Sequence, residues 1–128
     1  MNKILIAAGA VIIIGTVVTT AARYRELPDR IPIHFGLDGS ANRYGPRSAI
    51  WILVATQLLI ASTYALTGGE GGLGSLITND CILAIAWYAQ LQIISAAITG
   101  QNRINPLRFW IFFAVMMAAG IAATRFRD

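Results

Sequence analysis

Four long runs of apolar residues divide the chain and set its predicted architecture. They cover residues 4–22, 49–66, 81–99 and 108–123. The first three runs contain no Asp, Glu, Lys or Arg, and the fourth carries only Arg108 at its start. A helix of about 20 apolar residues crosses the hydrocarbon core of a bilayer. The pattern therefore predicts an all-α membrane protein, a bundle of four transmembrane helices in a single domain of residues 1–128.

The first run has a competing interpretation as a signal peptide, because Lys3 precedes it and small residues end it. Its apolar part is longer than the 7–15 residues typical of a signal peptide. The basic residues Arg23 and Arg25 follow directly. We interpret the run as a retained span.

Polar positions inside and between the later runs predict how the helices are placed. Gln92 shares a helix face with Tyr88, whereas Gln90 lies on another face. A helix with polar groups on two faces is expected at the centre of a bundle, with neighbours on both sides. Residues 67–80 contain five glycines. They predict a flexible connection that ends in a helix cap at Asn79 or Asp80.

The segment between the first two spans, residues 23–48, is rich in polar residues. This stretch holds the only histidine, His34, and three of the four prolines. Prolines favour extended backbone at the residues before them, and apolar residues at positions 31, 33 and 35 alternate as in a strand. We predict a small extended or hairpin-like cap at the mouth of the bundle. Four of its residues are interpreted as shape-determining: Pro28, Pro32, Gly39 and Gly45.

Composition and charge support a membrane protein. Hydrophobic residues make up 56 % of the chain and charged residues 12 %, whereas soluble domains contain about 25 % charged residues. The net charge is +4, but the basic residues lie at the edges of apolar runs, which favours contact with anionic lipid over nucleic acid. Seven arginines lie on the side of the cap and three basic residues on the other. This bias predicts a cytoplasmic cap.

Catalytic and metal chemistry are disfavoured. One cysteine and one histidine do not supply the ligands of a structural zinc site. None of the predicted spans has an ionisable residue in its middle, where transporters and proton relays carry them. No serine near His34 is placed as a nucleophile. The sequence therefore predicts a protein that is not an enzyme and has no cofactor.

The cap also carries a family resemblance. The stretch LPDRIPIHFGLDGSANRYGPRS resembles the signature of a bacterial membrane domain of unknown function, found alone and at the N-terminal end of SdpI-like immunity proteins. The matching residues are Leu27, Pro28, Ile31, Pro32, His34, Phe35, Gly39, Arg43, Tyr44, Gly45 and Arg47. Arg47 stands where the pattern usually has Lys. The resemblance implies a multi-pass protein of the bacterial inner membrane, of immunity or accessory type.

Five cap residues are candidates for recognition at the membrane surface: His34, Phe35, Arg43, Tyr44 and Arg47. Their expected partners are membrane lipid and a membrane protein or peptide. Two interpretations of His34 stay open, a proton- or ligand-sensing side chain or a structural one hydrogen-bonded to Asp29 or Asp38. The alternative function is that of a small structural subunit of a larger membrane complex.

Overall fold

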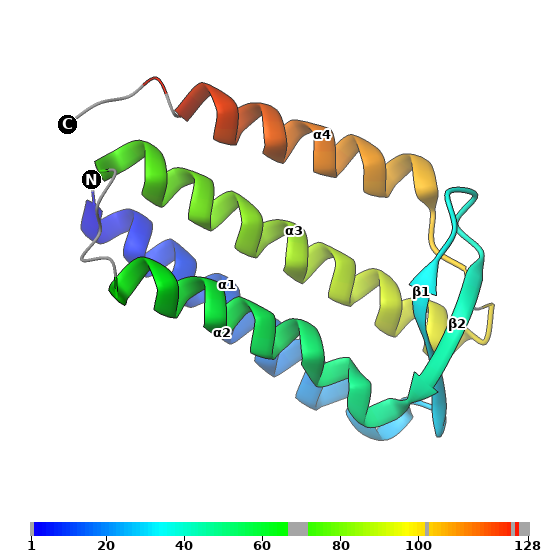
Figure 1. The fold of residues 1–128 in the computed structure, drawn as a ribbon. Coiled ribbons are helices and arrows are strands. Elements are labelled where there is room, and N and C mark those ends of the chain that lie inside the picture. The colour runs from blue at the N-terminus through cyan, green and yellow to red at the C-terminus, as the bar shows by residue number, and fades with distance from the viewer. Residues whose placement is uncertain (1, 67–71, 102, 124, 126–128) are drawn as a thin grey trace.

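Four helices and one β-hairpin make up the part of the chain that the structure describes (Figure 1). The computed structural model describes residues 2–66, 72–101, 103–123 and 125. The helices and strands are α1 (Asn2–Arg23), β1 (Arg30–Phe35), β2 (Ala41–Pro46), α2 (Trp51–Leu66), α3 (Gly72–Thr99) and α4 (Pro106–Ala123). The short 3₁₀ turns η1 (Tyr24–Glu26) and η2 (Arg47–Ile50) flank the hairpin. The hairpin closes one end of the helices, and the beginning of α1 and the end of α4 lie at the other (Figure 1).

Three of the helical segments are long and apolar enough to cross a membrane. These are Lys3–Glu26, Gly74–Thr99 and Pro106–Ala123, with 24, 26 and 18 residues. A fourth apolar segment, Arg47–Ser62, is shorter. Many large apolar side chains on the outer helix faces are exposed, as expected where lipid replaces water as the solvent. The chain is therefore a membrane protein, with at least three candidate spans among the described residues.

The third helix differs most from the sequence prediction. It begins at Gly72, so residues 72–80 are helical and not part of a flexible connection. The predicted cap at Asn79 or Asp80 is wrong, because both residues lie inside the helix. Leu76 packs in the interior with only 2 % of its surface exposed, which stabilises a helical turn that its glycine neighbours disfavour. Residues 67–71 of the predicted connection lie outside the described part.

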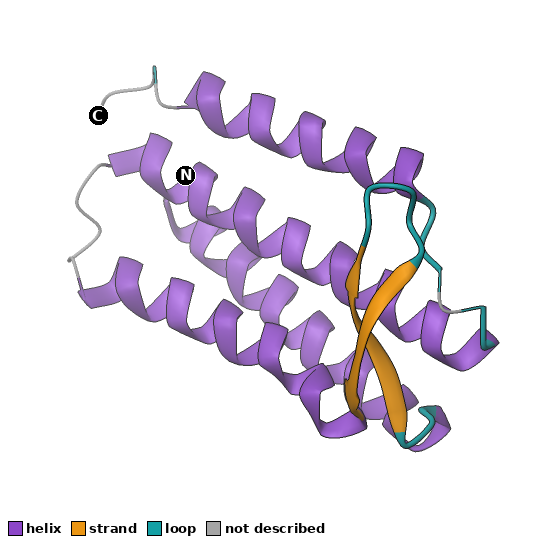
Figure 2. Ribbon diagram, turned by 45° about the vertical axis from the view of Figure 1, so that its right-hand side comes forward, coloured by secondary structure: helices purple, strands orange, loops and turns teal. Residues whose placement is uncertain are grey.

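Helix α3 lies at the centre of the structure. It packs against α1, α2 and α4. Helix α4, in contrast, has α3 as its main helix partner. Figures 1 and 2 show α4 on the side of α3 away from α1 and α2. The Trp87 ring comes within 2.7 Å of the place where a Cβ on Gly15 would stand, so α1 and α3 approach closely. The prediction of a central position for this span is confirmed.

The hairpin crosses the helix ends (Figure 2). Its strands are antiparallel, with Ile31 opposite Gly45 and a register shift on either side of His34. Ile31 is fully buried, in a cluster with Leu27, Ile50, Ile94 and Ala97. The predicted alternation holds only in part, because Ile33 is 38 % exposed and Pro32 is buried. A β-bulge adds a residue to one strand and changes which faces its side chains occupy.

Candidate functional site

The tip of the hairpin is a tight turn with internal hydrogen bonds. The Gly39 amide donates to the Gly36 carbonyl at 3.0 Å, and the Gly36 amide donates to the Ser40 carbonyl at 2.8 Å. Asp38 Oδ1 accepts hydrogen bonds from the Ser40 hydroxyl at 2.7 Å and the Ser40 amide at 3.1 Å. These bonds, the hydroxyl first, lower the pKa of the Asp38 carboxyl. The turn is therefore preorganised before any partner reaches it.

The α3–α4 connection holds this tip from outside the hairpin. The Ile104 amide donates to the Gly39 carbonyl at 2.9 Å, and Arg103 Nη2 donates to the Asp38 carbonyl at 2.8 Å. Gly39 has φ +86°, and a Cβ added there would lie 2.4 Å from the Ile104 carbonyl oxygen. Only glycine fits both the backbone angle and the approach. The cap thus docks onto a connection that is distant in sequence.

The base of the cap is held by Arg47. Its amide donates to the Asp29 carbonyl at 3.0 Å, and its Nη1 lies 3.5 Å from the Leu27 carbonyl oxygen. Its guanidinium carbon lies 5.5 Å from the centre of the Tyr24 ring, which in turn packs 5.8 Å from Trp51. Arg47 is half-buried and occupied by these contacts. It therefore belongs to the support of the cap more than to its outer surface.

The other candidate residues lie on the exposed side or at the edge of the hairpin. His34 is exposed, and its Nδ1 lies 2.6 Å from Asn42 Oδ1. The expected acid partners, Asp29 and Asp38, do not contact His34 in the described part of the chain. Arg43 is exposed, and its side chain has no hydrogen bond or ion pair among the described residues. The Tyr44 carbonyl accepts a bond from Arg30 at 3.3 Å.

A cavity of about 300 Å³ lies where the hairpin meets α3 and α4. We call it the cap groove. Its lining includes Ile33, His34 and Phe35 from β1, Gln92 from α3, and Phe109 and Trp110 from α4. Of the five sequence candidates the structure brings His34 and Phe35 to the groove, while Arg43, Tyr44 and Arg47 do not line it.

Sequence reasoning did not connect Gln92, Phe109 and Trp110 with the cap. A signal for this was present in the order of the spans. If four spans alternate in direction, the cap and the α3–α4 connection emerge on the same side of the membrane. That topology places the aromatic start of α4 beside the hairpin, but it does not say which side chains meet.

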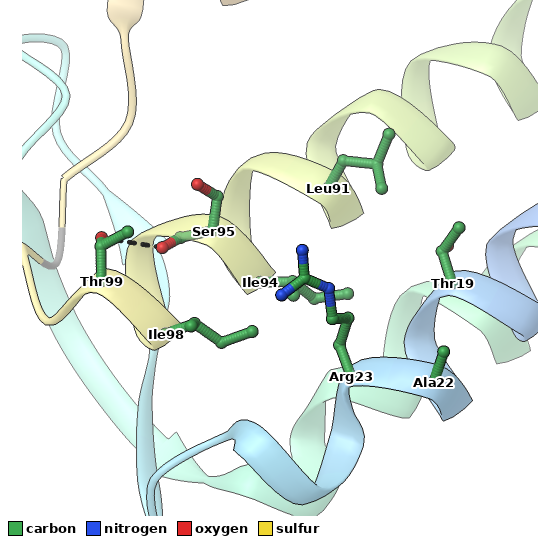
Figure 3. Close-up of a pocket in the computed structure, with 8 residues that line it drawn as sticks. All are labelled: Thr19, Ala22, Arg23, Leu91, Ile94, Ser95, Ile98 and Thr99. Carbon is green, nitrogen blue, oxygen red and sulfur yellow. Dashed lines mark hydrogen bonds between the residues drawn. The ribbon is translucent and has the colours of Figure 1, made fainter.

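A second cavity, of about 360 Å³, lies between the ends of α1 and α3 (Figure 3). Its charged residue is Arg23, whose side chain extends between the two helices toward Ile94 (Figure 3). Arg23 Nη1 lies 3.3 Å from Glu26 Oε2, an ion pair at the surface. The arginine in this cavity thus already has an acidic partner.

Two glutamines form buried polar contacts between α1, α2 and α3. Gln57 Nε2 donates to Thr16 Oγ1 and to the Leu83 carbonyl, both at 3.0 Å. Gln90 Nε2 donates to Thr20 Oγ1 at 3.0 Å and to the Ile50 carbonyl at 2.7 Å. Both glutamine side chains are fully buried. Since carbonyl oxygens only accept, the amide nitrogens must face them, which fixes the orientation of both side chains.

The structure also places an acid inside a candidate span. Asp80 is only 9 % exposed and lies in Gly74–Thr99. Its Oδ1 would be 2.6 Å from a Cβ on Gly9 of α1. Neither carboxylate oxygen has a hydrogen-bond partner in the part of the chain that the structure describes. Asp80 therefore lies inside the first part of this span, whereas the middle of the span carries no Asp, Glu, Lys, Arg or His, as predicted.

A signal for Asp80 was present in the spacing of the sequence. Leu76, Asp80, Leu83, Trp87 and Gln90 are separated alternately by four and three residues. That spacing keeps them on one helix face. The glycines before Leu76 obscured the pattern, because they also fit a loop.

We expect Asp80→Asn to raise the thermal midpoint of the protein in detergent by a few degrees. An unpartnered carboxyl in an apolar interior costs free energy, and an amide of the same shape removes the acidic group. Asp29→Asn is the matched control, because Asp29 is exposed, and its midpoint should not move. A lower midpoint for Asp80→Asn would show that the carboxyl stabilises the fold.

Comparison with known proteins gives one match. Residues 11–58 match a domain of unknown function, DUF1648. The matched segment runs from the middle of α1 through the hairpin and into α2. Comparison with curated proteins finds no match, and comparison with solved structures finds none. The match thus links α1, the cap and the beginning of α2 as one module.

Proposed function

We propose that the chain is a non-enzymatic integral membrane protein of the SdpI-like immunity or accessory type, set in the bacterial inner membrane. In this proposal the cap recognises a peptide, protein or lipid at the membrane surface. The observation that carries it is a firmly docked cap end with exposed arginines that lack acidic partners. Residues 11–58 match a domain of unknown function, and the cap lies at the centre of the matched segment.

The same proposal has all four helices crossing the bilayer as a bundle. Helix α2 has 16 residues, which span roughly 24 Å at 1.5 Å per residue. That is shorter than the hydrocarbon core of about 30 Å, but local thinning of the bilayer accommodates such a difference. Helix α2 runs beside α1 between the cap end and the opposite end (Figure 1). Its ends therefore lie near the same two surfaces as those of α1.

Charge favours an anionic partner for the cap. The described residues contain one ion pair between side chains, Arg23 with Glu26. Arg25, Arg43 and Arg108 are exposed and have neither hydrogen bond nor ion pair through their side chains within the described ranges. Guanidinium groups bind carboxylates and phosphates through paired hydrogen bonds. The cap end is thus suited to an acidic peptide, an acidic protein segment or an anionic lipid.

The surroundings of His34 support recognition over catalysis. Its Nδ1 contacts the Asn42 amide oxygen and not a carboxylate. A histidine that activates a nucleophile usually has an orienting acid at that nitrogen. In the proposal His34 serves as a hydrogen-bonding residue of the cap.

Protection against a membrane-active peptide toxin tests the function. Deletion should sensitise bacteria, and Arg43→Ala should reproduce most of that loss, because it removes an unpaired charge from the cap. Arg125→Ala removes an exposed arginine at the opposite end and should keep full protection. Both variants must reach the membrane in equal amounts. Unchanged protection in Arg43→Ala and His34→Ala would remove the cap from the mechanism.

The alternative is a small structural subunit of a membrane complex. Helix α4 favours it, because only 11 % of its span is buried and its main helix partner is α3. Its outer face carries exposed apolar side chains such as Ile111 and Val115. Purification in mild detergent separates the two functions. A stoichiometric protein partner retained by the wild type and lost on Val115→Trp would support the subunit role, and a free small species would contradict it.

A further inference from the structure

We infer that the cap groove binds one anionic phospholipid, with an acyl chain along its apolar wall and the phosphate at an arginine rim. The inference deepens the proposed function, on which it rests for the position of the cap at the bilayer surface. It names a ligand for the groove in particular, whereas the proposed function concerns the cap as a whole.

The wall of the groove has the chemistry of a lipid chain site. Most of its lining is apolar or aromatic, including Ile33, Phe35, Phe109 and Trp110. The groove is open, since Ile33 keeps 38 % and Trp110 46 % of their surface exposed. Tryptophan is favoured at the boundary between hydrocarbon and headgroups. An acyl chain entering from the bilayer would therefore meet apolar side chains at the boundary between hydrocarbon and headgroups.

Three arginines are neighbours of residues that line the groove. Arg43 is the strand neighbour opposite His34, and Arg103 and Arg108 each directly precede a lining residue, Ile104 and Phe109. The Ser40 hydrogen bonds lower the pKa of the Asp38 carboxyl most, and Asp38 is close enough to Arg103 for the charge of that arginine to lower it further. Its Oδ1 accepts two bonds from Ser40. Arg103 donates to the Asp38 main chain and not to its carboxylate. The three guanidinium groups thus have no ion pair in the described structure, and basic pockets between membrane helices bind anionic headgroups.

Two polar groups in the lining are unoccupied. The His34 ring contacts Asn42 through Nδ1 and has no partner at Nε2 among the described residues, and the Gln92 side chain has no hydrogen bond there either. Both side chains reach the lining of the groove. Ester and phosphate oxygens of a lipid can accept hydrogen bonds from the side-chain amide nitrogen of Gln92, whereas Nε2 of a neutral His34 ring accepts, because Nδ1 donates to Asn42 Oδ1. The polar end of the groove therefore matches the region between chain and headgroup.

The larger cavity between α1 and α3 does not share these features. Its arginine, Arg23, is paired with Glu26. The remaining lining has two threonines and a serine but no other charge (Figure 3). An anionic headgroup would have to compete with the glutamate there. Of the two cavities, the cap groove is the one that combines an apolar wall with neighbouring arginines that have no ion pair.

Native mass spectrometry of the full chain in a mild non-ionic detergent tests the inference. The probes are phosphatidylglycerol and phosphatidylcholine with identical acyl chains. We expect one phosphatidylglycerol per chain, bound roughly ten-fold more tightly than phosphatidylcholine. Both lipids carry a phosphate, but phosphatidylcholine also carries a choline cation, so only phosphatidylglycerol presents a net negative charge to the arginines. The double variant Arg43→Gln/Arg108→Gln should lose this preference. Ala89→Leu, which fills the groove, should weaken binding of phosphatidylglycerol with all arginines present.

Arg25→Gln is the matched control, because it removes an equally exposed arginine of the cap end that does not border the groove. Its lipid preference should equal that of the wild type. An equal loss in Arg25→Gln, or equal retention of both lipids by the wild type, would overturn the inference. If Ala89→Leu does not fold, the arginine variants decide, since they change only exposed residues. Intact lipid preference without toxin protection would instead contradict the proposed function alone.

Discussion

Gly39→Ala is expected to lower the stability of the protein by more than about 2 kcal/mol and to release the hairpin tip. The φ angle of +86° costs a residue with a Cβ roughly 1–2 kcal/mol. The added Cβ would also lie 2.4 Å from the Ile104 carbonyl oxygen and 2.9 Å from Pro106 Cδ. Relief of that contact requires the turn to move away from the α3–α4 connection. Thermal unfolding in detergent and protease cleavage of the cap measure the two effects.

Gly100→Ala separates the backbone strain from the steric contact. Gly100 has φ +72°, but a Cβ there would meet no atom within 4 Å. Gly100→Ala should therefore lower the stability by only about 1–2 kcal/mol, which is what the backbone angle costs. Equal losses for the two variants would show that the contact between the tip and Ile104 contributes nothing.

Gln90→Leu is expected to destabilise the helix bundle by about 1–3 kcal/mol. The change removes two hydrogen bonds, to Thr20 and to the Ile50 carbonyl. Hydrogen bonds between membrane helices contribute about 0.6 kcal/mol on average and up to about 1.7 kcal/mol. The Ile50 carbonyl would in addition lose this partner in a buried position. The midpoint of thermal or denaturant unfolding reports the loss.

Gln92→Leu is the control for this variant. Gln92 lies on the same helix and is half-buried, and its side chain makes no hydrogen bond in the described part of the structure. The same substitution should therefore change stability by less than about 0.5 kcal/mol. If Gln90→Leu and Gln92→Leu lower the stability equally, the loss comes from replacing any glutamine of this helix by leucine and not from the hydrogen bonds of Gln90.

The cap shows how far reasoning from sequence extends. Prolines and a glycine turn predict two short extended arms, and the structure has a hairpin at Arg30–Phe35 and Ala41–Pro46. The register shifts beside His34 were not predictable, because they depend on how Ile31 and Pro32 pack against helix ends. The partner of His34 is likewise a product of that register. Arg43 pairs opposite His34, and the bulge brings the neighbouring Asn42, not either acid, to His34 Nδ1.

For the third helix the sequence led to a wrong prediction of secondary structure. Five glycines within residues 67–80 predicted a loop, yet the helix begins at Gly72. Local propensity is a weak determinant, and packing of Leu76 in the interior overrides it. The consequence is chemical as well as structural. Asp80 moves from a predicted surface cap to the interior of a candidate span.

By itself the sequence determined that this is a helical membrane protein with a polar cap between its first two apolar segments. Those conclusions follow from run length, from the scarcity of charge and from the local effects of proline and glycine. Only the tertiary structure decided which distant residues meet: Gly39 with Ile104, Gln90 with Thr20 and Ile50, and His34 with the groove at Trp110. The physical reason is that such contacts depend on the rotation and depth of packed helices. Apolar runs with little periodicity do not specify either.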